Sequence, residues 1–359
     1  MPVTIITVIL VLIILVVIHE LGHFTAAKLL GIKVEEFGFG LPPRAWGKKI
    51  GETLYSLNWL PVGGFVRLYG EDAEHPEHVK KERSRAFFAK KPWERTIVLT
   101  AGVVMNFILG WIIFSYLATI GLPYPKDHVL ITGIAEGSPA ETSGLLTEDE
   151  VISISTNDRE ALAVANTQEL VTTIGNNLDE EIHITVLRDE SLVTIPIVPR
   201  SEHPEGQGAL GIEITDLEVV TAGSFPESIS LGFSYSIYVI RQTLDAIGDS
   251  LQKLFAGNTA EIQVGGFVLV GQVVGTARQA GFENLLYVIG MLSLNLALIN
   301  ILPFPALDGG RLAFVFYEGL TGKKPNARWE MYLHQFGMVF LLLLMLLITF
   351  NDILRLGRG

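Results

Sequence analysis

The chain contains no cysteine and comparatively little charge. Without cysteine there is no disulfide and no thiolate ligand, so a metal site here must use His, Asp, Glu or backbone oxygen. Charged residues make up 18% of the 359 residues, and the net charge is −12. This balance argues against nucleic-acid binding, which needs a basic face. Hydrophobic residues make up 49% and the mean hydropathy is +0.42, which indicates a membrane protein with a soluble portion.

Residues 1–31 are expected to form a retained transmembrane helix. The apolar run from Val3 to Leu30 is long enough to span a bilayer, and Gly31 is a natural stop. A secretory signal peptide would carry a basic segment before the run and a small-residue cleavage site after it. Neither feature is present, so the segment is interpreted as a span rather than a signal peptide.

The end of this run reads His19-Glu20-Leu21-Gly22-His23. Two histidines four residues apart lie on one helix face and can reach a single ion, whereas Glu20 points to an adjoining face, where it can take a proton from water. This is the zinc-peptidase pattern H-E-x-x-H. A chance match is the alternative. Because an ionisable group in hydrocarbon costs about 2.5–3.5 kcal/mol on insertion scales, a functional pair is favoured.

Residues 32–95 hold 12 of the 26 lysines and arginines, so the positive-inside rule places this loop in the cytoplasm and the N-terminus outside. Gly63-Gly64 and the alternating Phe65-Val66-Arg67 predict a strand whose edge can accept an extended peptide by strand addition. An ordinary surface hairpin is the alternative interpretation. The segment is therefore expected to be a membrane-associated β-hairpin with a substrate-binding edge.

The remaining chain divides by composition. Further spans are predicted at 96–122, 281–310 and 332–351, with a cytoplasmic loop at 311–331. In the second span, Gly102 and Asn106 share a face that suits a helix–helix contact. Gly137-Ser-Pro-Ala-Glu-Thr-Ser-Gly-Leu followed by Asp149-Glu-Val-Ile-Ser-Ile resembles a bacterial PDZ domain, covering 127–200. Residues 201–280 read as a strand and an amphipathic helix that lies on the membrane or on the soluble domain. The predicted fold is a polytopic α-helical membrane protein with four transmembrane helices, a membrane-associated β segment and an inserted PDZ-like α+β domain.

Helix parity places an acidic residue on the same side of the membrane as the two histidines, where it can be a third ligand. Residues 229–255 are too polar to span, so the helix over 281–310 runs from outside to inside, as the first helix does. Asp308 then emerges on the same cytoplasmic side as His19 and His23. If 229–255 did span, this shared site would fail. Three protein ligands with a fourth position open to water are what a catalytic zinc requires.

Taken together, the chain resembles the site-2 protease family of intramembrane zinc metalloproteases and, within it, the RseP-like bacterial group. The resemblance rests on HELGH, on PVGGFVRLYGE at 61–71, on KPWER with AGVVMN at 91–106, on one PDZ-like module, and on N-x-x-P-x-P-x-x-D-G-G at 300–310. It implies one Zn²⁺ per chain on His19, His23 and Asp308. It also implies that Asn295 and Asn300 help to hold the substrate, and that the Gly64–Tyr69 strand clamps an extended segment.

The expected activity is hydrolysis of peptide bonds within transmembrane segments of single-pass proteins, such as pre-trimmed anti-sigma factors or remnant signal peptides. The expected location is the bacterial plasma (inner) membrane, with the PDZ-like domain outside, engaging peptide or protein termini, and the active site near the cytoplasmic side. A membrane metal transporter or sensor is an alternative, but no internal repeat of spans is visible. A catalytically inactive PDZ scaffold is another, although a scaffold needs neither HELGH nor Asp308.

Overall fold

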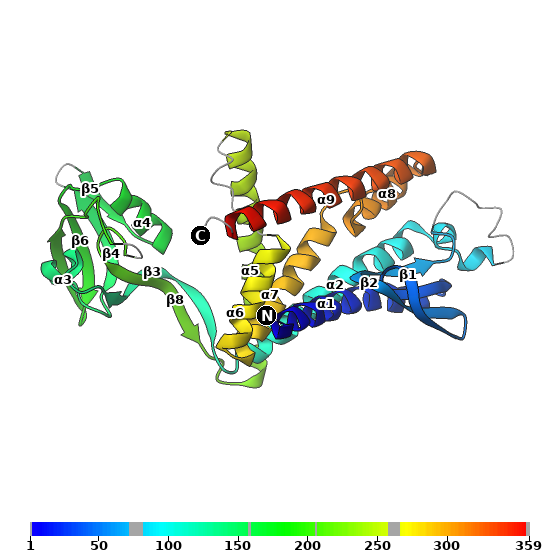
Figure 1. Ribbon diagram of the computed structural model, residues 1–359, viewed down its shortest axis with the longest axis horizontal. Coiled ribbons are helices and arrows are strands. Elements are labelled where there is room, and N and C mark those ends of the chain that lie inside the picture. Colours follow the sequence, from blue (N-terminus) through cyan, green and yellow to red (C-terminus); the bar gives the residue numbers. More distant parts are fainter. Residues whose placement is uncertain (1, 72–81, 157–158, 205–206, 258–265, 357–359) are drawn as a thin grey trace. The chain divides into compact units, whose positions relative to one another are not determined.

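The computed structural model describes residues 2–71, 82–156, 159–204, 207–257 and 266–356. The chain divides into two compact units. The first, here the helical unit, comprises Met1–Ile120 and Ala222–Gly359, and the second, here the sheet unit, comprises Gly121–Thr221. Figure 1 shows both units, coloured along the chain.

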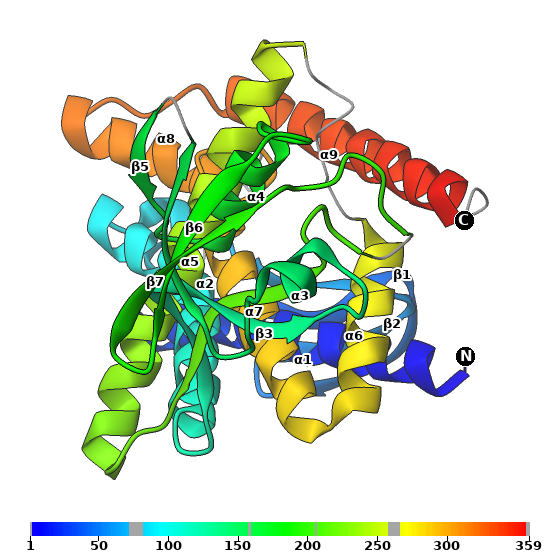
Figure 2. The same ribbon diagram turned by 90° about the vertical axis from the view of Figure 1, so that its left-hand side faces the viewer.

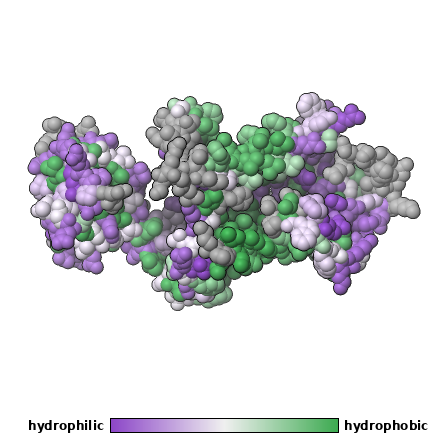
Figure 3. All heavy atoms as spheres, viewed as in Figure 1, coloured by the Kyte–Doolittle hydropathy of each residue, from purple (hydrophilic) through white to green (hydrophobic). Residues whose placement is uncertain are grey.

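Within the described residues, four helices of the helical unit are long and apolar enough to cross a membrane. They are α1 (Pro2–Leu29), α2 (Pro92–Leu117), α7 (Phe282–Ile301) and α9 (Ala327–Leu356). On the face shown in Figure 3, hydrophobic residues predominate over the middle of the helical unit, whereas hydrophilic residues gather at its hairpin end. The predicted spans are thereby confirmed as four apolar helices of a membrane protein.

Helix boundaries follow from local chemistry. Pro92 occupies the first turn of α2, where its missing N–H costs nothing, and the Lys91 N–H donates to Glu94 across 2.8 Å. α7 ends at Ile301 because Pro303 and Pro305 cannot continue the helix. The chain then turns into α8 (Asp308–Thr321), so much of the segment predicted as the loop 311–331 is helical.

The β-hairpin of the helical unit is formed by β1 (Val34–Ile50) and β2 (Thr53–Leu68). The first part of β1 pairs on both sides with β2: Phe37 is opposite Tyr55 on one side and opposite Val66 on the other. Within the described residues, the last part of β2, Gly64–Leu68, therefore pairs with β1 on one side only. This is the arrangement expected of an edge strand. Two 3₁₀ turns (Arg83–Arg85 and Phe87–Ala89) then lead into α2.

The amphipathic helix α5 (Phe225–Phe255) belongs to the helical unit. Phe233 packs edge-on against Phe107 and Trp111 of α2, and the Trp111 indole N–H donates to the Ile229 carbonyl across 3.0 Å. Figures 1 and 2 show α5 running across the direction of α1 and α9, and α5 is not among the four apolar helices. The shorter α6 (Phe267–Ala280) precedes α7.

The sheet unit is an antiparallel sheet closed by two helices (Figure 2). Its strands, in the order β7-β6-β4-β3-β8 with β5 beside β4, are β7 (Ser191–Ile197), β6 (Ile182–Arg188), β4 (Glu150–Thr156), β3 (Leu122–Ile134), β8 (Ile212–Val220) and β5 (Arg159–Ala163). The helices are α3 (Pro139–Ser143) and α4 (Thr167–Gly175), capped by Ser138 and Asn166. The unit extends beyond the predicted 127–200 because β8, assigned from sequence to a linker, pairs with β3.

The core of the sheet unit unites both helices with the strands. Leu170 and Ile174 of α4 and Ala140 of α3 pack with strand residues such as Ile154 and Ile184. At about 25 cal/mol per Å² of apolar surface removed from water, such a cluster is the main source of stability in a small domain. The buried Asp149 carboxylate forms an ion pair with the Arg188 guanidinium, so its negative charge is compensated.

Candidate metal centre

Glycines bring α1 and α2 unusually close together beneath the HELGH segment. A Cβ on Gly22 would clash with the Ala101 carbonyl and lie 2.9 Å from the Gly102 Cα. Only residues without a side chain permit this backbone approach. As a consequence, backbone atoms of α2 reach the imidazoles of α1: the ring Nδ1 of His23 lies 2.8 Å from the Val98 carbonyl oxygen.

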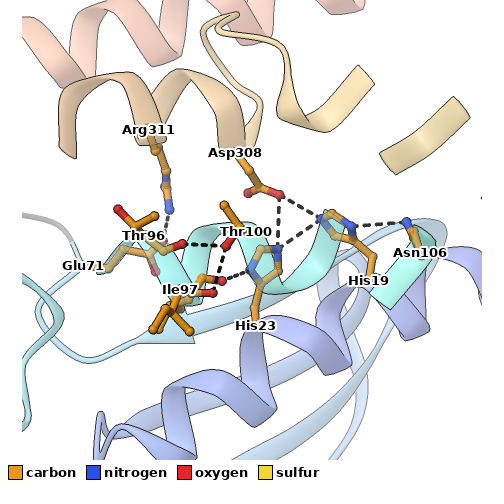
Figure 4. Close-up of polar contacts among 10 residues, drawn as sticks. His19, His23, Glu71, Thr96, Ile97, Thr100, Asn106, Asp308 and Arg311 are labelled. Carbon is orange, nitrogen blue, oxygen red and sulfur yellow. Dashed lines mark hydrogen bonds and ion pairs between the residues drawn. The ribbon is translucent and has the colours of Figure 1, made fainter. Parts of the chain in front are cut away.

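The three predicted metal ligands converge at this point (Figure 4). His19 Nε2 lies 3.0 Å from Asp308 Oδ2, His23 Nε2 lies 3.2 Å from the same oxygen, and the two Nε2 atoms are 3.1 Å apart. Both histidines are buried, and the Asp308 side chain is mostly covered. Residues 289 positions apart in the chain thus meet at a single point.

The connection between α7 and α8 aims Asp308 at the histidines. Ala306 takes a left-handed backbone conformation (φ 76°), and its N–H donates to His334 Nδ1 of α9 across 3.0 Å. A Cβ on Gly309 or Gly310 would collide with carbonyl groups of the residues just before the turn. The Asp-Gly-Gly sequence is therefore required sterically, because only glycine fits a turn this tight.

The donor set fits a zinc ion. The two imidazole nitrogens and the carboxylate oxygen lie within 4.8 Å of one another, and each faces the common centre. Two neutral imidazoles and one carboxylate are a known three-ligand set for catalytic zinc, with a further position left for water or substrate. Gly102 of α2 forms the floor of this site, since a Cβ there would lie 2.8 Å from His19 Nε2.

Glu20 and the edge strand border a cavity beside the ligands. The cavity has a volume of about 330 Å³ and is lined by Glu20, His23, Gly64, Phe65, Val66, Arg67, Leu68, Glu71, Val98, Leu99, Asp308 and Arg311. A Cβ on Gly64 would approach Glu20 Cγ to 2.9 Å, so the strand lies directly on α1 at the predicted base. The four residues predicted from the hairpin (Gly64, Phe65, Val66 and Arg67) thus share one cavity with Glu20, His23 and Asp308.

The structure does not bring the two predicted substrate-binding asparagines into this cavity. Asn295 lies on α7, where its side-chain oxygen accepts a hydrogen bond from the Thr243 hydroxyl of α5 across 2.8 Å. Asn300 is half-buried in the last turn of α7. Neither residue is among those that line the cavity.

Two ion pairs tie α8 to its surroundings near the site. Arg311, one turn after Asp308, pairs with Glu71 just beyond the edge strand (Figure 4). Arg95 of α2 pairs with Glu318 of α8 across 2.5 Å, and both side chains are largely buried. Buried pairs of this kind contribute most by fixing one arrangement, since loss of either partner leaves an unpaired charge. They hold the helix of Asp308 against the hairpin and α2.

Comparison with known proteins agrees with this geometry. A model of the family described as Peptidase family M50 matches residues 7–344. A Clostridium perfringens protein that carries a zinc metalloprotease name is 34% identical over 345 residues, 94% of each chain. The Regulator of sigma-W protease RasP of Bacillus subtilis is 28% identical over 416 residues, covering 94% of this chain and 95% of its own. Zinc metalloprotease RasP of Bacillus licheniformis is 27% identical, with 94% and 96% covered. The chain belongs to peptidase family M50, the site-2 proteases, and is a membrane-embedded zinc metalloprotease of that type.

Proposed function

We propose that this protease cleaves transmembrane segments of single-pass proteins at a single zinc held by His19, His23 and Asp308. The observation that carries the proposal is the meeting of these three side chains beside Glu20 and an edge strand with one free side. The ligands come from helices at opposite ends of the sequence, and no simpler structural need explains three ionisable groups packed together inside an apolar unit.

The chemistry divides between the ion and Glu20. A zinc ion on these ligands supplies Lewis acidity to water and to the scissile carbonyl. Glu20 accepts a proton from the attacking water as its oxygen bonds to the carbonyl carbon, and later gives that proton to the leaving amide nitrogen. The C–N bond then breaks, so the products are a carboxylate and an amine. The position of Glu20 on the cavity wall, next to His23, suits this transfer.

A helical substrate must unwind before it can react, because its carbonyls are bonded within the helix and lipid offers no replacement partners. Gly64–Leu68 can supply them by strand addition, since all five of its residues line the cavity beside Glu20. Asn295 and Asn300 are proposed to assist from α7. Asn295 would first have to exchange its bond with Thr243, which suggests a role in binding rather than in the resting site.

The hairpin and its basic loop are proposed to face the cytoplasm, by the positive-inside rule. The sheet unit, entered after α2, then lies on the opposite side as a PDZ-like domain. There it would bind exposed peptide or protein termini and admit substrates whose external part has been removed. A relative is named for regulation of sigma-W, which supports regulators of that class as substrates here, alongside remnant signal peptides. The proposed location is the bacterial plasma membrane.

The test is cleavage of a tagged single-pass transmembrane segment with a short external part, co-reconstituted with the protein in lipid vesicles. Wild type should release two fragments, and a matched substrate with a bulky external domain should be cut more slowly. Glu20→Gln should lose at least about 10²-fold in rate, as removal of a general base does, while retaining zinc. Undiminished cleavage by Glu20→Gln would overturn the assigned base. Absence of cleavage by wild type across a panel of segments would favour a scaffold.

A further inference from the structure

Three residues of α2, spaced four apart, form one continuous surface under the two histidines. Val98 presents its carbonyl oxygen to His23 Nδ1, Gly102 lies beneath both rings, and Asn106 places its amide 3.3 Å from His19 Nδ1. Residues at this spacing lie on one helix face. Figure 4 shows Asn106 on the far side of His19 from Asp308. The sequence alone predicts only a helix–helix contact for Gly102 and Asn106.

Asn106 has no other use for its side-chain amide within the described residues. Its side chain is fully buried, and its Oδ1 has no hydrogen-bond partner. The bond that joins α2 to α7 here runs from the Ser293 hydroxyl to the backbone carbonyl of Asn106, so it does not involve the side chain. A buried amide oxygen left without a partner is destabilising, which calls for a functional explanation.

The chemistry of the His19 imidazole provides a functional explanation for the unpaired Asn106 oxygen. A neutral histidine that offers Nε2 to a metal must carry its proton on Nδ1, and that N–H needs an acceptor. His23 has such an acceptor in the Val98 carbonyl. Among the residues that the structure describes, Asn106 is the hydrogen-bond partner of His19 Nδ1, and a half-turn of the amide about its last bond presents Oδ1 in place of Nδ2.

We infer that Asn106 is a positioning residue of the metal site, which accepts the Nδ1–H of His19 through Oδ1 and so directs Nε2 toward the ion. The inference rests on the proposed ligand role of His19. An amide suits both states of the site. When no ion is present, His19 can donate from Nε2 to Asp308 and accept from the Asn106 NH₂ group. When the ion binds, the same amide accepts instead, with no charge buried in the bundle.

Metal affinity, measured by competition with a chelator in detergent-solubilised protein, tests this without reference to cleavage. Asn106→Leu keeps the size but removes the acceptor, and zinc affinity should fall about 10–100-fold, the usual effect of losing such an outer partner. Asn106→Asp restores an acceptor and should recover affinity to within about threefold of wild type. Ser293→Ala is the matched control, because it removes the buried hydrogen bond to the backbone carbonyl of Asn106 but leaves the Asn106 side chain in place.

A second readout separates orientation from folding. With Co²⁺ in place of zinc, the visible absorption bands of Asn106→Leu should shift, whereas those of Ser293→Ala should match wild type. Wild-type zinc affinity in Asn106→Leu overturns the inference. So does an equal loss in Ser293→Ala, which would assign the effect to helix packing. Failure of Asn106→Asp to recover affinity, with elution and helicity unchanged, overturns it as well. Because none of these measurements involves peptide hydrolysis, they stand apart from the test of the protease function.

Discussion

Gly102 of α2 lies in direct contact with His23 of α1, so that a single added methyl group would occupy the space of the His23 Nε2 atom. The same methyl would lie 2.8 Å from His19 Nε2. The glycine is therefore part of the metal site, although it supplies no ligand. Its role is to let α1 and α2 approach closely enough for the imidazoles of α1 to contact the backbone of α2.

Gly102→Ala should consequently weaken zinc binding. Overpacking of this kind costs about 1–3 kcal/mol, which corresponds to roughly 10–100-fold in affinity if the strain falls on the site. Gly271→Ala in α6 is a matched control, since nothing lies within 4 Å of its added Cβ. Chelator competition on both variants measures the difference. Equal zinc affinity in the two would show that the site relaxes around the methyl group.

Removal of either a histidine or the aspartate should remove the metal. His23→Phe and Asp308→Ala each leave two ligands, too few to hold a catalytic zinc. Metal analysis of purified protein is expected to find about one zinc per chain in wild type and little in either variant. Zinc that survives loss of Asp308 would mean that α8 does not contribute the third ligand.

Gly64→Ala should impair cleavage without affecting the metal. The new Cβ would lie 2.9 Å from Glu20 Cγ and 2.8 Å from Val16 Cγ1, which forces the edge strand and α1 apart. Displacement of a reacting group by about 1 Å costs on the order of 10²-fold in rate. Gly47→Ala in the same hairpin is the control, because the atoms nearest to its added Cβ are Arg44 Cδ at 3.2 Å, Leu54 Cδ1 at 3.4 Å and the Tyr55 carbonyl oxygen at 3.5 Å. Rates and zinc content together decide the outcome, and a normal rate in Gly64→Ala would contradict the assigned strand position.

The hairpin should loosen in acid. Hydrogen bonds from Lys28 and Arg85, each 2.7 Å long, lower the pKa of Glu52 below its ordinary value of 4.5. Because the folded-state pKa is depressed, this contribution to stability is present above the unfolded-state pKa and is lost as the pH falls through the folded-state value. Thermal unfolding of wild type and Glu52→Gln should therefore differ near neutral pH and converge as the pH falls below the ordinary value of 4.5. A difference that is independent of pH would show that charge is not its cause.

Several features could be predicted because they depend on local pattern. Long apolar runs predicted four spans, and four apolar helices are present, with ends that differ from the predicted ones, most of all in α7, which ends at Ile301 and not at 310. The spacing of His19 and His23 predicted a shared face, since four residues make about one turn. Parity predicted that Asp308 would join them, a result of counting spans rather than of any contact. This prediction for Asp308 depended on the interpretation that residues 229–255 do not span the membrane.

Other features had no local signal. β8 looked like a linker strand because its partner, β3, lies far away in sequence. Nothing in the sequence near Asn295 indicated that its amide oxygen accepts a hydrogen bond from Thr243 of α5. Asn106 looked like packing, and the only sign of another role was a polar residue four positions after Gly102 on a face expected to contact another helix.

The sequence by itself determined the kind of protein, the apolar helices and the chemical identity of the ligands, because hydropathy and side-chain chemistry are carried by each residue wherever it lies. Only the tertiary structure decided what surrounds those ligands. Which carbonyl meets His23, which amide meets His19, and which strand edge lies beside Glu20 depend on how closely helices approach. That distance is set by glycines such as Gly22 and Gly102 on two different helices, and steric fit between distant segments cannot be calculated from either segment alone.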